Sequence, residues 1–201
     1  MDAPTDEMLL REYLAGQTAS FELLVRRHAE ELYKFALRFT ASRVAAEDVV
    51  QETFLQVHLS ASTFDPKRRL KPWIFTIAAN KARDYLRRRD RKREVPFDAE
   101  IGGEEKVGKR FIDLISSNRP APDAELMLDE KRRLVRDVIE TLPGKWYEIL
   151  ILAYYHRFPY RDIAEIVGIP VGTVKSRVHT AIAVFADRYV EAVEEYAKRR
   201  P

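Results

Sequence analysis

A short stretch near the C-terminus concentrates the side chains best suited to reading nucleic acid. Between Pro170 and Phe185, polar residues recur on one side of an expected helix, and aliphatic residues mark the other side. Hydroxyls, an ammonium, a guanidinium and an imidazole are groups that reach base edges and phosphates in a DNA major groove. The candidate duplex-reading residues are Thr173, Lys175, Ser176, Arg177, His179 and Thr180.

Two predicted helices and a tight turn must position these side chains. The first helix carries Ile163 and Ala164 and ends at Gly168, the residue type that most easily adopts a left-handed backbone. A second helix starts after Pro170. Its expected buried stripe consists of Val174, Val178, Ala181, Ile182 and Phe185. This order is typical of a helix-turn-helix, and a plain helical hairpin with a polar face is the alternative.

A helix beginning near Pro72 supplies a second candidate surface. Its expected buried side contains Ile74, Phe75, Ala78, Ala79, Ala82, Tyr85 and Leu86. The opposite stripe carries Trp73, Thr76, Asn80, Arg83 and Arg87. Each base stacked on an aromatic ring contributes about 1–3 kcal/mol, whereas opening a duplex costs about 1.4 kcal/mol per step. The stripe therefore favours binding of melted DNA by an exposed indole, and a Trp73 packed into the core is the alternative.

Charge is distributed unevenly along the 201 residues, whose formal net charge is +3. Residues 65–93 carry 12 basic and 3 acidic side chains, whereas residues 94–130 carry 4 basic and 10 acidic ones. A dense basic block is typical of a surface that binds polyanions, and a solvated helix face is the alternative. The basic block contains the second candidate surface, so charge and residue type point to the same chemistry.

The apolar periodicity predicts an all-α protein. Helical spacing starts at Phe21, resumes at Ala45 and appears again after Pro72. It is lost in the acidic stretch that follows and returns at Leu126. No strand-like alternation bounded by turn residues is present. We therefore expect two small helical domains.

A flexible acidic linker is expected between these domains. Residues 94–125 combine glycines, prolines and acidic residues with weak periodicity. A short helical piece near Phe111 to Ile115 is the only exception that we expect. The domain boundaries that follow are 1–93 for the first domain and 126–201 for the second.

Catalytic, metal and cofactor chemistry find no support in the residue types. The chain has no cysteine, and its four histidines are scattered without metal-ligand spacing. His28 lies on an apolar face, which predicts a packed core position. No Gly-rich phosphate loop or nucleophile elbow is present, and an unrecognised nuclease is the enzymatic alternative. The acidic N-terminus and the short apolar runs predict a cytoplasmic protein without membrane insertion.

Four sequence motifs follow one another in a fixed order. They are DVVQETF from Asp48, WIFTIAANKARDYLRR from Trp73, the pair Leu142 and Pro143, and DIAEIVGIPVGTVKSRV from Asp162. Together they resemble the extracytoplasmic-function (ECF) branch of the bacterial sigma-70 family, over nearly the whole chain. The resemblance implies a non-catalytic transcription-initiation factor that binds core RNA polymerase and directs it to promoters.

The resemblance also implies a role for each surface. The helix with Asp48, Gln51 and Glu52 is similar to the family's main polymerase contact, which docks on the clamp coiled coil of the largest subunit. The loop from Ser62 to Lys71 captures a flipped base of the −10 element, and the next helix engages the melted strand. The implied −10 residues are Lys67, Arg68, Arg69, Lys71, Trp73, Thr76, Asn80, Arg83 and Arg87. The duplex-reading residues of the last helix read the −35 element.

Two further partners follow from the resemblance. The acidic linker is similar to the family segment that threads the polymerase cleft along the RNA path, where its negative balance mimics nucleic acid. Most family members are restrained by an anti-sigma factor, so we expect one here.

Some positions depart from the family pattern. Thr180 stands where an arginine is often found, which removes one charged −35 contact. Arg157 and Phe158 stand where a small turn residue is common, and the helix past Asp187 has no implied role.

The alternative function is a stand-alone helix-turn-helix regulator that binds duplex DNA without polymerase. The Trp73 stripe and the long linker favour a sigma factor, because such a regulator has no use for either.

Overall fold

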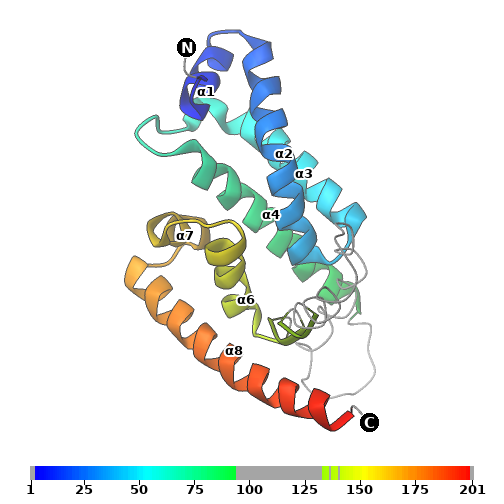
Figure 1. Ribbon diagram of the computed structural model, residues 1–201. Coiled ribbons are helices and arrows are strands. Elements are labelled where there is room, and N and C mark those ends of the chain that lie inside the picture. Colours follow the sequence, from blue (N-terminus) through cyan, green and yellow to red (C-terminus); the bar gives the residue numbers. More distant parts are fainter. Residues whose placement is uncertain (1–2, 94–132, 136, 140, 200–201) are drawn as a thin grey trace, which may run out of the picture. The chain divides into compact units, whose positions relative to one another are not determined.

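The computed structural model describes residues 3–93, 133–135, 137–139 and 141–199. Every regular element in these ranges is helical, which confirms the predicted all-α class (Figure 1). The described helices form two compact units: the first holds residues 3–93 together with 161–169, and the second holds the described residues between 133 and 160 and residues 170–199. The linker expected at 94–125, with its short helical piece, lies outside the described residues. Across the described ranges, no helix has the length and apolarity needed to cross a membrane.

A short N-terminal helix, α1 (Asp6–Leu14), precedes the first helix that the apolar periodicity predicts. Thr5 caps this helix, because its side-chain oxygen (Oγ1) accepts a 3.3 Å hydrogen bond from the backbone N–H of Met8. Such a bond satisfies one of the donors that every helix start leaves open. Leu9 and Leu10 are buried and attach α1 to the rest of the unit. The sequence prediction misses this helix.

The core of the first unit is built by α2 (Thr18–Thr40) and α3 (Arg43–Ser60), which pack against each other. The buried residues of α2 recur at helical spacing and include Leu24, His28, Leu32, Phe35 and Phe39. The predicted core position of His28 is therefore confirmed. Ser42 caps α3 by accepting a hydrogen bond from the backbone N–H of Ala45, so this helix begins two residues before its expected start.

The last of the N-terminal helices is α4 (Leu70–Arg93), which follows the short η1 (Ala61–Thr63) and an irregular loop. Three alanines of α4 are almost fully buried, and their small side chains let the helix lie close to its neighbours. They are Ala78, Ala79 and Ala82. The ring of Phe75 meets that of Phe35 edge-on, with centroids 5.4 Å apart. The core face predicted for this helix is confirmed at these positions.

The C-terminal half of the chain contains a further series of helices. Residues 133–135 and 137–139 are helical, and α6 (Gly144–Leu150), the π-helical turn η3 (Ile151–Tyr155), α7 (Tyr160–Val167) and α8 (Val171–Arg199) follow. A buried cluster of Leu142, Leu150 and Ala181 joins α6 to α8. The side chains of Trp146 and Phe185 pack against this cluster.

The face of α8 differs from the sequence prediction at one residue. Ile182 is 41% exposed, although it was expected in the buried stripe. It follows the fully buried Ala181 by about 100° around the helix, and so it lies at the margin of the buried face. There it borders an apolar pocket together with Phe185 and Tyr154.

The extension of α8 past Asp187 is tied to the same unit. The guanidinium of Arg188 donates to the carbonyl oxygen of Thr141 and, over 2.8 Å, to its hydroxyl. The ring of Tyr189 stacks on that of Phe185, with centroids 5.7 Å apart. The first turn of the extension is therefore part of the folded unit, a role that the sequence did not reveal.

Candidate nucleic-acid interface

The turn between α7 and α8 has the backbone that the sequence predicts. Gly168 adopts a positive φ of 74°, and its N–H donates to the carbonyl of Ala164 over 2.9 Å. The N–H of Ile169 donates to the same carbonyl over 3.0 Å. These two bonds close α7, and α8 begins two residues later at Val171. The chain therefore forms the helix, turn and helix expected of this motif.

The predicted duplex-reading residues all lie in the first ten residues of α8. Lys175, Ser176, His179 and Thr180 are exposed, and Thr173 and Arg177 are half-buried. The buried residues Val174, Val178 and Ala181 occupy the other side of the same turns. This separation leaves the N-terminal part of a long helix with a polar face, which is the arrangement that enters a major groove.

A second group of predicted residues lies where the loop meets α4. Trp73 is half-buried, not exposed as the stripe predicted, because Phe64 of the loop covers part of its ring with centroids 5.0 Å apart. The hydroxyl of Thr76 donates to the carbonyl of Pro72 over 2.9 Å. The indole of Trp73 therefore packs against the loop, and part of its surface remains exposed to solvent.

Farther along α4, the predicted polar residues are linked to one another. The side-chain carbonyl of the exposed Asn80 accepts a 2.7 Å hydrogen bond from Arg83. Arg87 is also exposed and pairs with Asp84 on the next turn. These contacts hold the amide and the guanidinium groups on one side of the helix, in line with Trp73.

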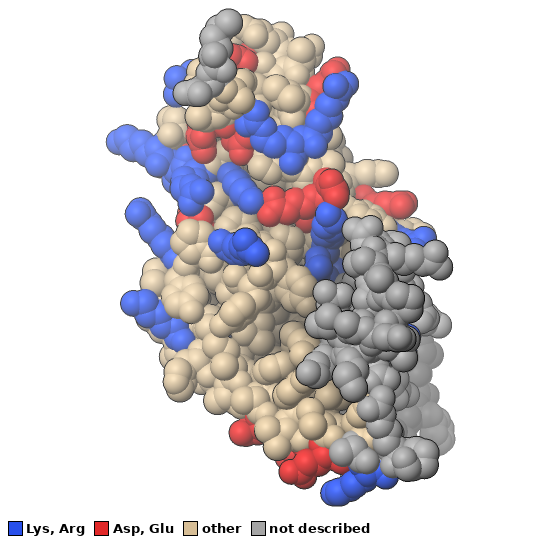
Figure 2. All heavy atoms as spheres, in the orientation of Figure 1, with Lys and Arg blue, Asp and Glu red and all other residues tan. Residues whose placement is uncertain are grey.

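The cations of the basic block are partly balanced by acids within the first unit. The ammonium nitrogen (Nζ) of Lys71 lies 2.9 Å from a carboxylate oxygen of Glu31, and that of Lys81 lies 3.2 Å from one of Glu52. Lys67, Arg68 and Arg69 lie in the exposed loop, where Arg68 pairs with Glu165 and Arg69 lies 2.6 Å from a carboxylate oxygen of Asp162. Figure 2 shows basic and acidic side chains interspersed over the first unit. Several cations of the block, in the loop and on α4, are therefore already paired with acids of the fold.

A different kind of surface runs along the outer face of α3. Three large apolar side chains are exposed there, Val44 at 69%, Leu55 at 58% and Leu59 at 64%. Asp48 and Gln51 are exposed between them, on the same side of the helix. Predicted polymerase-contacting residues thus lie within a stripe of exposed aliphatic side chains that sequence analysis did not identify. We call Val44, Asp48, Gln51, Leu55 and Leu59 the α3 stripe.

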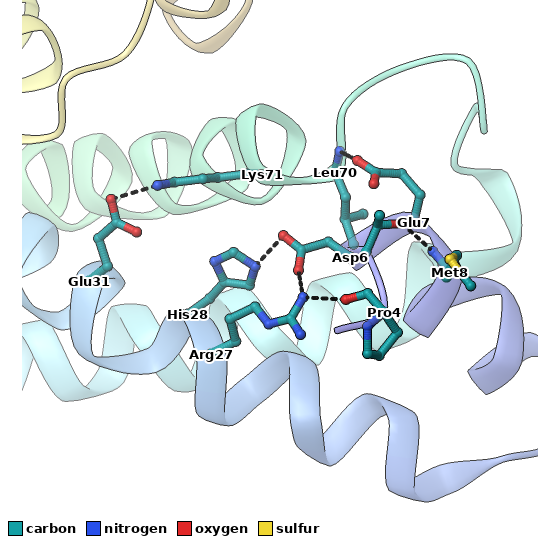
Figure 3. A network of polar contacts seen from close by, with 10 residues as sticks. Pro4, Asp6, Glu7, Met8, Arg27, His28, Glu31, Leu70 and Lys71 are labelled. Atoms are coloured by element: carbon teal, nitrogen blue, oxygen red, sulfur yellow. Dashed lines mark hydrogen bonds and ion pairs between the residues drawn. The ribbon is translucent and has the colours of Figure 1, made fainter. Parts of the chain in front are cut away.

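Sequence reasoning also missed a polar network that joins α1 to the rest of the first unit (Figure 3). Asp6 accepts a 2.6 Å hydrogen bond from Arg27 and lies 2.7 Å from the ring nitrogen (Nε2) of His28. Burial acts to raise the pKa of Asp6, and the hydrogen bonds and charges of His28 and Arg27 outweigh it, so the pKa lies below its ordinary value. Glu7 accepts a 2.8 Å hydrogen bond from the backbone N–H of Leu70.

Arg157, which stands where the family commonly has a small turn residue, has an unusual backbone geometry. This residue has a φ of 52°, in the left-handed region that side chains other than glycine rarely adopt. It connects η3 to the loop before α7, where the N–H of Phe158 donates to the carbonyl of Leu152. A small turn residue suits this position because it relieves the contact between Cβ and the backbone.

Two family models match the chain. The model of sigma-70 region 2 matches residues 24–92, and the model of sigma-70 region 4 matches residues 132–183. The first match covers α3 and most of α2 and α4, and the second contains the helix-turn-helix.

Relatives of known identity match over most of their length. The ECF RNA polymerase sigma-E factor of Haemophilus influenzae is 32% identical over 181 residues, which are 88% of this chain and 91% of that protein. The ECF RNA polymerase sigma factor SigW of Bacillus subtilis is 28% identical over 170 residues, 85% of this chain and 89% of that protein.

Solved structures have the same fold. CnrH in complex with the cytosolic domain of CnrY matches with a TM-score of 0.63 at 24% identity, over 90% of this chain and 95% of that chain. The sigma factor RpoE of Bartonella quintana, in complex with the anti-sigma factor NepR, matches with a TM-score of 0.62 at 24% identity, over 87% of this chain and 96% of that chain. The two family models and the relative at 32% identity establish that the chain belongs to the ECF sigma factors of the sigma-70 family.

Proposed function

We propose that this sigma factor docks on the clamp coiled coil of the largest subunit of core RNA polymerase through the α3 stripe. The observation that carries this proposal is the exposure of Val44, Leu55 and Leu59, interleaved with Asp48 and Gln51. An exposed aliphatic row with polar residues between its members is suited to a partner helix, because both helices then bury apolar area at their contact. Its position on region 2 agrees with the motif that resembles the family's polymerase contact.

The DNA contacts are divided between the two regions. Residues 1–93 melt and hold the −10 element, with the loop after η1 and the face of α4 that carries Trp73 and Asn80. Residues 126–201 read the −35 element as duplex through the N-terminal part of α8, and the linker at 94–125 sets the reach between them. This division is supported by the half-exposed indole beside the loop and by the polar face of α8.

The protein acts by binding alone and catalyses no reaction of its own. Its place of action is the cytoplasm, where polymerase and promoter DNA are found. CnrH and RpoE have been solved in complex with CnrY and with the anti-sigma factor NepR, and we extend this to an anti-sigma partner for the present chain.

The test of the docking proposal is a titration of labelled full-length protein with purified bacterial core RNA polymerase. The variant carries Asp48→Arg and Glu52→Arg, which place one cation within the α3 stripe and a second one directly after Gln51 in the sequence of the same helix. The matched control carries Glu22→Arg and Glu30→Arg on α2, which break ion pairs with Arg26 and Lys34 as Glu52→Arg breaks the pair with Lys81. We expect tight binding by the wild type and the control and at least tenfold weaker binding by the variant. Equal binding by all three proteins would refute docking through α3.

A further inference from the structure

The start of α4 is held by a side chain that lies 63 residues earlier in the sequence. The backbone N–H of Leu70, the first residue of α4, donates to a carboxylate oxygen (Oε1) of Glu7 over 2.8 Å. A helix start has unpaired N–H donors and a partial positive charge, so a carboxylate is the favoured partner. Pro72 has no N–H, which removes another donor of this turn. Glu7 therefore acts as a cap supplied by a separate helix.

Leu70 also anchors the C-terminal end of the loop that precedes α4. Within that loop, the N–H of Lys67 donates to the carboxylate of Asp65 over 2.9 Å, and the N–H of Arg68 donates to its carbonyl over 3.0 Å. These bonds shape the middle of the loop. Its C-terminal end is fixed by the fully buried side chain of Leu70, by the bond to Glu7 and by the ion pairs of Arg68 with Glu165 and of Arg69 with Asp162.

The helix that carries Glu7 is itself held at several points (Figure 3). Asp6 binds Arg27 and His28 of α2, and Figure 3 shows these side chains next to the contact between Glu7 and Leu70. At the other end of α1, Glu12 accepts a 2.6 Å hydrogen bond from Ser20. Because α1 has these other attachments, removal of the Glu7 side chain alone leaves it in place.

We propose that Glu7 is a positioning residue for −10 recognition. By capping Leu70 it fixes the end of the loop that captures the flipped base, and so it sharpens the choice of that base without touching DNA. This inference rests on the proposed function of the loop. It makes α1, which the sequence analysis missed, a part of the promoter-reading apparatus.

The experiment uses the full-length protein bound to core RNA polymerase. A promoter is first selected from a random-sequence DNA pool by the wild-type holoenzyme, and 2-aminopurine fluorescence identifies the flipped base of its −10 element. Opening rates are then measured for this promoter and for the three substitutions at that base. The variants are Glu7→Ala, Glu7→Gln and the control Glu12→Ala, which removes an α1 carboxylate that binds α2 and not α4.

We expect Glu7→Ala to reduce discrimination at the flipped base about fivefold, which corresponds to about 1 kcal/mol, with polymerase affinity unchanged. Glu7→Gln restores most of the discrimination because its side-chain carbonyl still accepts the bond. Hydrogen exchange of a peptide spanning residues 64–71 in the free protein should be faster in Glu7→Ala alone.

Four results would overturn the inference. Unchanged discrimination by Glu7→Ala would exclude a positioning role, and an equal loss in Glu12→Ala would assign the effect to α1 stability. A wild-type holoenzyme that selects no promoter would instead refute the proposed function, and this role with it. Unchanged exchange at residues 64–71 in Glu7→Ala would separately show that the cap does not hold the loop.

Discussion

The contact of Asp6 with α2 provides a quantitative test of how α1 is held. Asp6→Asn removes the negative charge and leaves one oxygen able to accept a hydrogen bond. The Asp6 side chain is 17% exposed, and its partners Arg27 and His28 are 32% and 4% exposed, so solvent screens these bonds only in part. Hydrogen bonds to charged groups contribute about 1.5–3 kcal/mol each. Because one acceptor is retained, we expect a loss of about 2 kcal/mol in the free energy of unfolding of the first unit.

Urea unfolding followed by tryptophan emission measures this loss. The chain has two tryptophans, Trp73 in the first unit and Trp146 in the second. A Trp146→Phe background therefore leaves Trp73 as the reporter of the first unit. At a slope of about 2 kcal/mol per M, the midpoint should fall by about 1 M. The control Glu22→Gln removes an exposed pair of 3.9 Å with Arg26 and should cost less than about 0.5 kcal/mol.

The difference in the free energy of unfolding between wild type and Asp6→Asn should decrease as the pH is lowered. The pKa of Asp6 in the folded protein lies below its ordinary value of 3.8. Its contribution is therefore fully present above that ordinary value and is lost as the pH falls through the lower folded pKa. We expect a constant difference from pH 7 to about pH 5 and a narrowing below about pH 4. A difference that is absent at pH 7, or that stays constant down to about pH 3, would refute the charge-assisted contact.

Four further substitutions test the sites and the backbone. Trp73→Ala should slow promoter opening about tenfold, through lost base stacking, while changing polymerase affinity less than twofold, and normal opening in a fluorescent promoter assay would exclude the stacking role. Arg177→Glu should weaken binding of the −35 element about tenfold and reduce the salt dependence of holoenzyme binding, and unchanged promoter selectivity would remove Arg177 from the reading face. Arg157→Gly should raise the stability of the second unit by about 1 kcal/mol because its φ of 52° suits glycine, whereas Gly168→Ala, at a φ of 74°, should destabilise the turn between α7 and α8. An unchanged or lower Tm of Arg157→Gly, followed by Trp146 emission, would contradict the argument from backbone strain.

The parts of the fold that short-range signals determine were predictable. Gly168 and Pro170 mark a turn within a few residues, and α8 starts at the next residue. The start of α3 near Ala45 was also correct to two residues, because Ser42 supplies a local cap. α4 begins two residues before Pro72, which places this proline inside the first turn, where its missing N–H is still tolerated.

The missed features depend on residues that are distant in the chain. α1 has nine residues, and the contacts that fix it join Asp6 to His28 and Glu7 to Leu70. Its local signals are the cap Thr5 and the acids of its first turn, which the sequence prediction overlooked. The partial burial of Trp73 results from Phe64, whose position depends on the loop and not on helical spacing. Periodicity identifies the inner face of a helix, but it does not show what a neighbouring loop places over the outer face.

The α3 stripe was predicted in part. The motif that resembles the family drew attention to Asp48, Gln51 and Glu52, and the structure adds that Glu52 pairs with Lys81 whereas Asp48 and Gln51 are exposed. The exposed Leu55 and Leu59 were not singled out, because aliphatic residues in a helix are read as core unless the structure shows otherwise.

The most direct test of the central claim is DNA binding with and without core RNA polymerase. Fluorescence anisotropy is measured at physiological salt on the promoter that the holoenzyme selects and on a scrambled duplex. We predict weak binding by the protein alone, with a Kd of about 1 μM or higher on both duplexes, and a Kd of about 10 nM or lower on the promoter alone once polymerase is added. Tight, sequence-specific binding by the isolated protein, unchanged by polymerase, would contradict the account and identify a stand-alone regulator.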